Sequence, residues 1–125
     1  MESTGMTRQE LFDWVKSEYG TLPEYQWAKF PRYAVLRNDD NKWYAVIMDI
    51  PKNKFDIDSD EVVDVLNVKA DMMLIDMLVG KPGYYRGYHM NKNQWISIFL
   101  DGSVPDEAIK NLIAESYEKT SKKKR

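Results

Sequence analysis

One short segment of the chain gathers side chains that could recognise a nucleic acid. It has the sequence RGYHMNKNQWISIFLDG, covers residues 86–102 and contains the only histidine, His89. Basic side chains can contact phosphates, carboxamides can pair with base edges, and aromatic rings can stack on bases. A β-ribbon with such a tip is one known way to enter a DNA groove. The candidate DNA-binding residues are Arg86, Tyr88, His89, Asn91, Lys92, Asn93 and Trp95, with Gln94 beside them.

The same segment also suits an ordinary hairpin turn. Asparagine tolerates the left-handed backbone of a tight turn, and lysine is common on solvated surfaces. The residue types alone therefore leave a recognition surface and a plain surface turn both open.

Nucleophilic catalysis has few candidates in this sequence. Cysteine is absent and His89 is the only histidine, so most hydrolytic dyads cannot form. A lone histidine on a strand is more often a hydrogen-bonded structural residue than a general base. We therefore expect no enzymatic activity and no cofactor, unless a deep cleft brings His89 beside a carboxylate.

A metal site is not expected either. Residues 56–67, DIDSDEVVDVLN, begin like a calcium-binding loop because an aspartate occupies every second position from Asp56. However, Glu61 stands where the sharp turn of such a loop needs glycine, and Asn67 stands where it needs a bidentate glutamate. The glycines of GKPG, residues 80–83, lack the spacing of a phosphate-binding loop.

Length and composition indicate one compact soluble domain. The chain has 125 residues, of which 43% are hydrophobic and 30% charged. No apolar run approaches the roughly 20 residues that a membrane span requires, and the N-terminus lacks the pattern of a secretory signal. We therefore expect a cytoplasmic monomer without a membrane partner.

The charge distribution limits the affinity that a polyanion could gain. The formal net charge is -2, and the last four residues, Lys122–Arg125, are all basic. Without them the body carries 14 basic and 20 acidic residues, a net charge of -6. Sequence-independent DNA binding normally relies on a basic excess, so we expect modest affinity confined to one face.

The periodicity of apolar residues predicts three helices and five strands. Thr7 and Glu10 have the spacing of a capping box, Met6 and Leu11 that of a hydrophobic staple, and Gly20 suits the helix end. Asp71 is placed to cap a second helix that is apolar nearly all round, so we expect this helix to be well buried. The predicted strands cover residues 32–38, 42–50, 62–68, 84–90 and 95–100, and a last helix follows Pro105.

This order, α-β-β-β-α-β-β-α, predicts an α+β fold: a mainly antiparallel sheet of about five strands with helices packed on one face. Along the last strand, Ile96 and Ile98 should face the helices, while Trp95, Ser97 and Phe99 should face the opposite side. The predicted strands hold more aromatic rings than a one-sided core requires. These rings form either a second set of buried pairs or an aromatic recognition surface.

Two segments resemble a known family. Residues 87–118, GYHMNKNQWISIFLDGSVPDEAIKNLIAESYE, closely resemble the C-terminal signature of the MmcQ/YjbR family, a YHMNK-type segment followed by a Trp-containing strand and a final helix. LNVKADM, residues 66–72, resembles the family's strand-to-helix junction, usually written around LKCDP. Here Ala70 and Met72 replace the Cys and Pro, and Lys69 is the retained polar residue.

That family is commonly described as DNA-binding, with an α+β fold likened to frataxin-type or double-wing domains. The resemblance implies a small non-catalytic protein, with a flexible segment 1–6, a domain over residues 7–118 and a basic disordered tail over 119–125. It would present the hairpin at residues 86–95 to double-stranded DNA. The alternative is a module that binds a protein or a small ligand through the same aromatic and amide surface.

Overall fold

A computed structural model describes residues 6–121, and the expected features at residues 1–5 and 122–125 lie outside that range. The order of elements is α1 (Arg8–Tyr19), β1 (Ala34–Arg37), β2 (Trp43–Pro51), a 3₁₀ turn η1 (Lys52–Phe55), β3 (Val62–Lys69), α2 (Met72–Leu78), β4 (Tyr84–Arg86), β5 (Trp95–Phe99) and α3 (Asp106–Thr120). All strand pairs are antiparallel and the sheet order is β1-β2-β3-β5-β4. The expected α+β fold is therefore confirmed.

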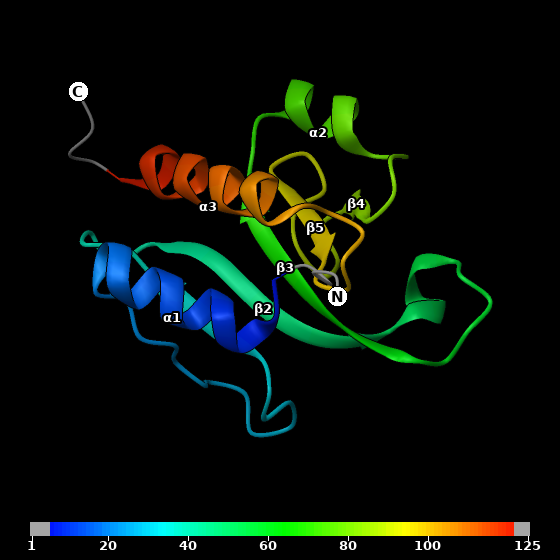
Figure 1. Ribbon diagram of the computed structural model, residues 1–125, viewed down its shortest axis with the longest axis horizontal. Helices are drawn as coiled ribbons and strands as arrows, with labels where there is room; N and C mark the ends of the chain where they lie inside the picture. Colours follow the sequence, from blue (N-terminus) through cyan, green and yellow to red (C-terminus); the bar gives the residue numbers. More distant parts are fainter. Residues whose placement is uncertain (1–5, 122–125) are drawn as a thin grey trace.

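Helices α1 and α3 lie across one face of the sheet (Figure 1). The capping box of α1 is present: the Thr7 hydroxyl accepts the N–H of Glu10 at 3.1 Å, and the Thr7 N–H donates to the Glu10 carboxylate at 3.0 Å. Met6 is already buried beside Leu11, as the staple predicts. Gly20 ends the helix in the left-handed conformation.

A buried hydroxyl joins α3 to the sheet. Ser116 is completely buried; its Oγ accepts the N–H of Lys69 at 2.9 Å and donates to the C=O of Tyr44 at 2.6 Å. Lys69 is the last residue of β3, so the Ser116 hydroxyl fixes α3 against the end of that strand. The helix continues through Thr120, two residues past the domain end expected from the sequence.

The β1–β2 pair contains an irregularity that turns Tyr44 toward the helices. Leu36 pairs with Ala45 and Arg37 with Trp43, so Tyr44 is an additional residue on β2. Its ring is fully buried and its hydroxyl donates to Thr21 at 2.8 Å. Burial raises the pKa of the Tyr44 phenol well above its ordinary value, so this tyrosine stays neutral.

Aromatic rings form a second core on the opposite face of the sheet. Phe99 points there while Ile96 and Ile98 face the helices, as strand alternation predicts. The cover comes from the segment before β1, from η1 and from the turn after β4. The rings packed in this layer are Trp27, Tyr33, Trp43, Phe55, Tyr85, Tyr88 and Phe99. The aromatic excess is thus largely a second core and not an open stacking surface.

Strand β4 is shorter than predicted. It ends at Arg86, where residues 84–90 were expected to be extended. A Cβ on Gly87 would lie 2.8 Å from the Cβ of Trp95, and His89 has a φ of 61°, so the chain turns back over the sheet. The turn is held by the Tyr88 N–H, which donates to the Ser97 hydroxyl at 2.9 Å. Ser97 in turn donates to the buried Asn67.

The prediction that α2 is well buried is wrong. Only Ile75 is buried, while Met72, Met73 and Met77 are 52%, 76% and 64% exposed. The helix lies at the β4 end of the molecule with one side against it (Figure 1), so an apolar sequence all round still leaves most of its surface in solvent. Asp71 makes no capping hydrogen bond; its carboxylate pairs with Lys119.

Replacing Ser116 should weaken the join between α3 and the sheet. Ser116→Ala leaves the Lys69 N–H and the Tyr44 C=O without a buried partner, so we expect the free energy of unfolding to fall by about 1–3 kcal/mol. Urea denaturation measures this. Ser17→Ala on the exposed side of α1 is a matched control. Equal stability of the two variants would contradict the proposed role of the hydroxyl.

Removing the Ser97 hydroxyl should release the turn after β4. Ser97→Ala deletes the acceptor of the Tyr88 N–H, so the hydrogen exchange of this amide should become faster than in the wild type. The Gly87 amide, which donates to the C=O of Trp95 at 3.1 Å, provides an internal control because its acceptor is retained. An unchanged Tyr88 exchange rate would show that the turn is held by other contacts.

Candidate nucleic-acid interface

The residues predicted to bind DNA do not form one surface. Arg86 makes an ion pair with Asp76 of α2 at 2.7 Å. The ammonium of Lys92 donates to the C=O of Gly87 at 2.8 Å, and thus braces the turn from within. The Asn91 side chain accepts the N–H of the second following residue at 2.9 Å. Lys92 and Asn91 therefore hold the turn together, while Arg86 joins the hairpin to α2.

The remaining predicted residues separate into two places. Tyr88 is half-buried, with its ring 5.5 Å from the ring of Phe55, and His89 lies beside it on the aromatic face. Asn93 and Trp95 instead line a groove at the end of the sheet. Trp95 is 8% exposed, so it contributes a wall and offers little ring surface for stacking.

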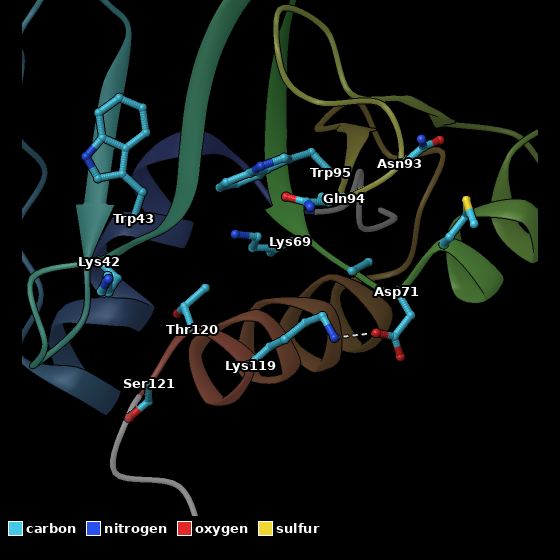
Figure 2. A pocket seen from close by; sticks show the side chains of 12 residues that line it. Lys42, Trp43, Lys69, Asp71, Asn93, Gln94, Trp95, Lys119, Thr120 and Ser121 are labelled. Atoms are coloured by element: carbon cyan, nitrogen blue, oxygen red, sulfur yellow. Dashed lines mark hydrogen bonds and ion pairs between the residues drawn. The ribbon is translucent and has the colours of Figure 1, made fainter.

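The groove has a volume of about 720 Å³ and lies where β3 ends and where β2 and β5 begin. Figure 2 shows Lys69 in the middle, with Trp95 on one side and the last turn of α3 on the other. The side chains that give it its chemistry are Lys42, Trp43, Lys69, Asn93, Gln94, Trp95 and Lys119.

Buried polar contacts set the positions of these walls. Asn38 is 7% exposed; its Oδ1 accepts the N–H of Lys42 at 3.0 Å, and its Nδ2 donates to the Thr120 hydroxyl at 2.8 Å. One carboxamide therefore fixes the β1–β2 turn and the end of α3 together. On the other side of the groove, the N–H of Ala70 donates to the C=O of Gln94 at 2.9 Å, which joins the end of β3 to the turn that precedes β5.

The groove contains uncompensated positive charge. Within residues 6–121, Lys42 and Lys69 make no ion pair, whereas Lys119 is paired with Asp71 (Figure 2). The Lys69 ammonium lies 5.7 Å from the centre of the Trp95 ring, where the π face favours a cation. Two free ammonium groups and two carboxamides suit an anion that also accepts and donates hydrogen bonds, such as a phosphate backbone beside a base.

Only part of this groove could be predicted from the sequence. Lys69 was identified as the retained polar residue of the strand-to-helix junction, and Asn93, Gln94 and Trp95 belong to the hairpin. The roles of Lys42 and Lys119 in the groove could not be predicted, because each is a single lysine in a polar segment of the sequence.

A second hollow lies over the aromatic face, and it contains His89. This hollow of about 400 Å³ is also lined by Asp49, so the histidine and a carboxylate share one site. Asp49 is paired with Arg32 at 3.6 Å. Within residues 6–121, no group of three or more histidine, aspartate or glutamate side chains could hold a metal ion. No helix in that range is long and apolar enough to cross a membrane.

Comparison with known proteins gives consistent relatives. The uncharacterized protein YyaQ of Bacillus subtilis (strain 168) is 41% identical over 116 residues, which cover 92% of this chain and 98% of that protein. A crystal structure and an NMR structure of a Pseudomonas syringae protein share 44% identity with this chain and cover 93% of it. The matched region covers 100% of the chain in the crystal structure, with a TM-score of 0.89, and 94% of the chain in the NMR structure, with a TM-score of 0.82.

A crystal structure of a Deinococcus radiodurans protein, described as a DUF419 domain, has a TM-score of 0.72 over 98% of this chain and 84% of that chain. At 23% identity this similarity supports the fold alone. The family model described as YjbR matches residues 7–119, nearly the whole of the described structure. By this match, and by its 41% identity to YyaQ, the chain belongs to the YjbR family.

Proposed function

We propose that this protein binds DNA by holding backbone phosphates in the groove at the end of the sheet. The observation that carries the proposal is the pair Lys42 and Lys69, two lysines without an acidic partner in residues 6–121 that line one groove. Phosphate contacts by such lysines supply most of the affinity in sequence-independent binding.

The proposed surface differs from the hairpin at residues 86–95. Of that hairpin, only the 93–95 end reaches the groove, where the amides of Asn93 and Gln94 lie beside the lysines. These amides are suited to base edges or to phosphate oxygens. We assign Lys92 to the structure of the turn and Arg86 to the contact with α2, and neither of them to the DNA.

Four basic residues follow the last described residue in the sequence. Ser121 lines the groove, and the next four residues in the sequence are Lys122, Lys123, Lys124 and Arg125. The body is nevertheless acidic, so the affinity should be modest and salt-sensitive. We further propose that the protein acts in the cytoplasm as a monomer, without catalysis and without a cofactor.

Neutralising the groove lysines should weaken DNA binding. Lys42→Gln and Lys69→Gln each remove one phosphate contact, so each should reduce the slope of log affinity against log salt by about one. Fluorescence anisotropy of a labelled random-sequence duplex, titrated at several salt concentrations, measures both affinity and slope.

Three further chains test the placement. Lys81→Gln removes an exposed lysine that has no ion pair in residues 6–121 and lies outside the groove, so its binding should match the wild type. Lys92→Gln should have little effect if the groove, and not the hairpin tip, contacts DNA. A chain ending at Ser121 should retain salt-sensitive binding. Binding lost with the last four residues, or unchanged in the Lys42→Gln Lys69→Gln double variant, would refute the groove as the DNA site.

A further inference from the structure

A small apolar hollow lies on the aromatic face of the sheet, opposite α1 and α3. It has a volume of about 240 Å³, and its main walls are Trp27, Phe30, Tyr33, Trp43, Met48 and Met90. A polar protein surface rarely leaves several large rings around an open space, and such a hollow with a few convergent polar groups is the usual form of a small-molecule site.

The walls support one another in a fixed arrangement. The Trp27 ring meets the Trp43 and Tyr33 rings edge-to-face, with centroids 5.8 and 6.0 Å apart. Phe30 stacks on Tyr33 at 4.6 Å and is 46% exposed, so it forms the outer rim. The rings thus already have contacts of the kind aromatic groups prefer, and a planar ligand can add to them without rearrangement.

The apolar hollow adjoins the more polar hollow of about 400 Å³. Phe30, Tyr33 and His89 line both, so the two spaces lie side by side at these residues. Lys29 and Lys54 line the polar hollow, and neither makes an ion pair within residues 6–121.

The acid in this polar hollow is already neutralised. Asp49 pairs with the Arg32 Nε at 3.6 Å, and Arg32 also approaches Asp64 at 3.5 Å. Asp64 is engaged by Arg8 at 3.2 Å as well. Two arginines therefore balance two aspartates, and the two free lysines set the sign of the charge that the hollow favours.

His89 stands between the two spaces in an unusual backbone conformation. Its φ of 61° lies in the left-handed region, which residues other than glycine seldom adopt. The bond from the Tyr88 N–H to Ser97 and the bond from Lys92 to the Gly87 C=O hold this turn. Backbone strain that the surroundings maintain often marks a functional position, and here the strained residue lines both hollows.

We propose that this pair of hollows binds a small aromatic carboxylate. The ligand ring lies in the apolar hollow against Trp27, Tyr33 and Trp43, and the carboxylate lies toward Lys29, Lys54 and His89. A cavity of about 150 Å³ takes benzene, so 240 Å³ has room for a fused two-ring system. A cationic ligand is disfavoured, because the uncompensated charges at the polar end are positive.

This site is separate from the DNA groove and does not rest on it. The groove lies at the end of the sheet beside α3, and the hollows lie over its aromatic face; Trp43 is the one lining residue that they share. Either proposal can fail while the other stands.

The test uses 2-naphthoate with the full chain, beside its neutral analogue 2-naphthylmethanol and its cationic analogue 2-naphthylmethylammonium. Isothermal titration calorimetry gives the affinities, and the indole N–H signals in NMR give the location. We expect 2-naphthoate to bind roughly fivefold or more tightly than the alcohol. The signals of Trp27 and Trp43 should shift, while that of Trp14 on α1 should stay in place.

Paired variants separate the two ends of the site. Phe30→Ala should weaken binding of both the carboxylate and the alcohol. Tyr25→Ala removes a ring of similar exposure, 55% against 46%, on the same segment but outside the hollow, and should weaken neither. The Lys29→Gln Lys54→Gln double variant should remove the preference for the carboxylate.

Three results would overturn the proposal: no binding of 2-naphthoate at millimolar concentration, equal effects of Phe30→Ala and Tyr25→Ala, or tighter binding of the ammonium analogue. Wild-type DNA affinity in the Phe30→Ala variant would show that a change at the hollow leaves the groove intact, as two separate sites require.

Discussion

The buried hydroxyl of Ser116 is the contact on which the arrangement of the groove depends. A serine buried on α3 must have its hydrogen-bonding capacity satisfied, because no water reaches it. The hydroxyl accepts a hydrogen bond from the N–H of Lys69 and donates one to the C=O of Tyr44. Only one position of α3 along the sheet allows both hydrogen bonds. The next turn of the helix carries Lys119 and Thr120 to the mouth of the groove. Tertiary packing thus sets the site through a residue that does not line it.

The two faces of the sheet are buried in different ways. Helices cover one face with many aliphatic side chains and a cluster of Tyr19, Tyr44 and Tyr117, while loops and turns cover the other face mainly with aromatic rings. The second cover includes a polar link, in which the Tyr88 N–H reaches Ser97 and Ser97 reaches Asn67. Asn67 and Ser97 are both fully buried, so they must satisfy each other, and they fix the histidine turn against the sheet as they do so. Tyr88 and Met90 of the YHMNK segment therefore belong to a layer of the fold, while the three other side chains of the segment are exposed.

Net charge describes this protein poorly. Most arginines are engaged by carboxylates, as Arg37 is by Glu24 and Arg86 by Asp76. Partly exposed pairs of this kind add little stability, but they remove charge of both signs from the surrounding field. The local charge is then set by the groups without an ionic partner among residues 6–121, and in the groove these are Lys42 and Lys69. An acidic chain can in this way present a locally basic site.

Local signals in the sequence determined most of the elements. The Thr7–Glu10 cap, the glycine at position 20 and the alternation of Ile96 and Ile98 depend on neighbours a few residues away, and the structure contains each as expected. The predictions of the length of β4 and of the burial of α2 were wrong, because both properties depend on which parts of the fold each segment packs against. The groove is also a tertiary result: Lys42, Lys69 and Lys119 are far apart in the chain and meet through the strand order and the docking of α3. Short-range hydrogen bonding and periodicity are written in consecutive residues, whereas convergence at a site requires the long-range packing that only the folded chain supplies.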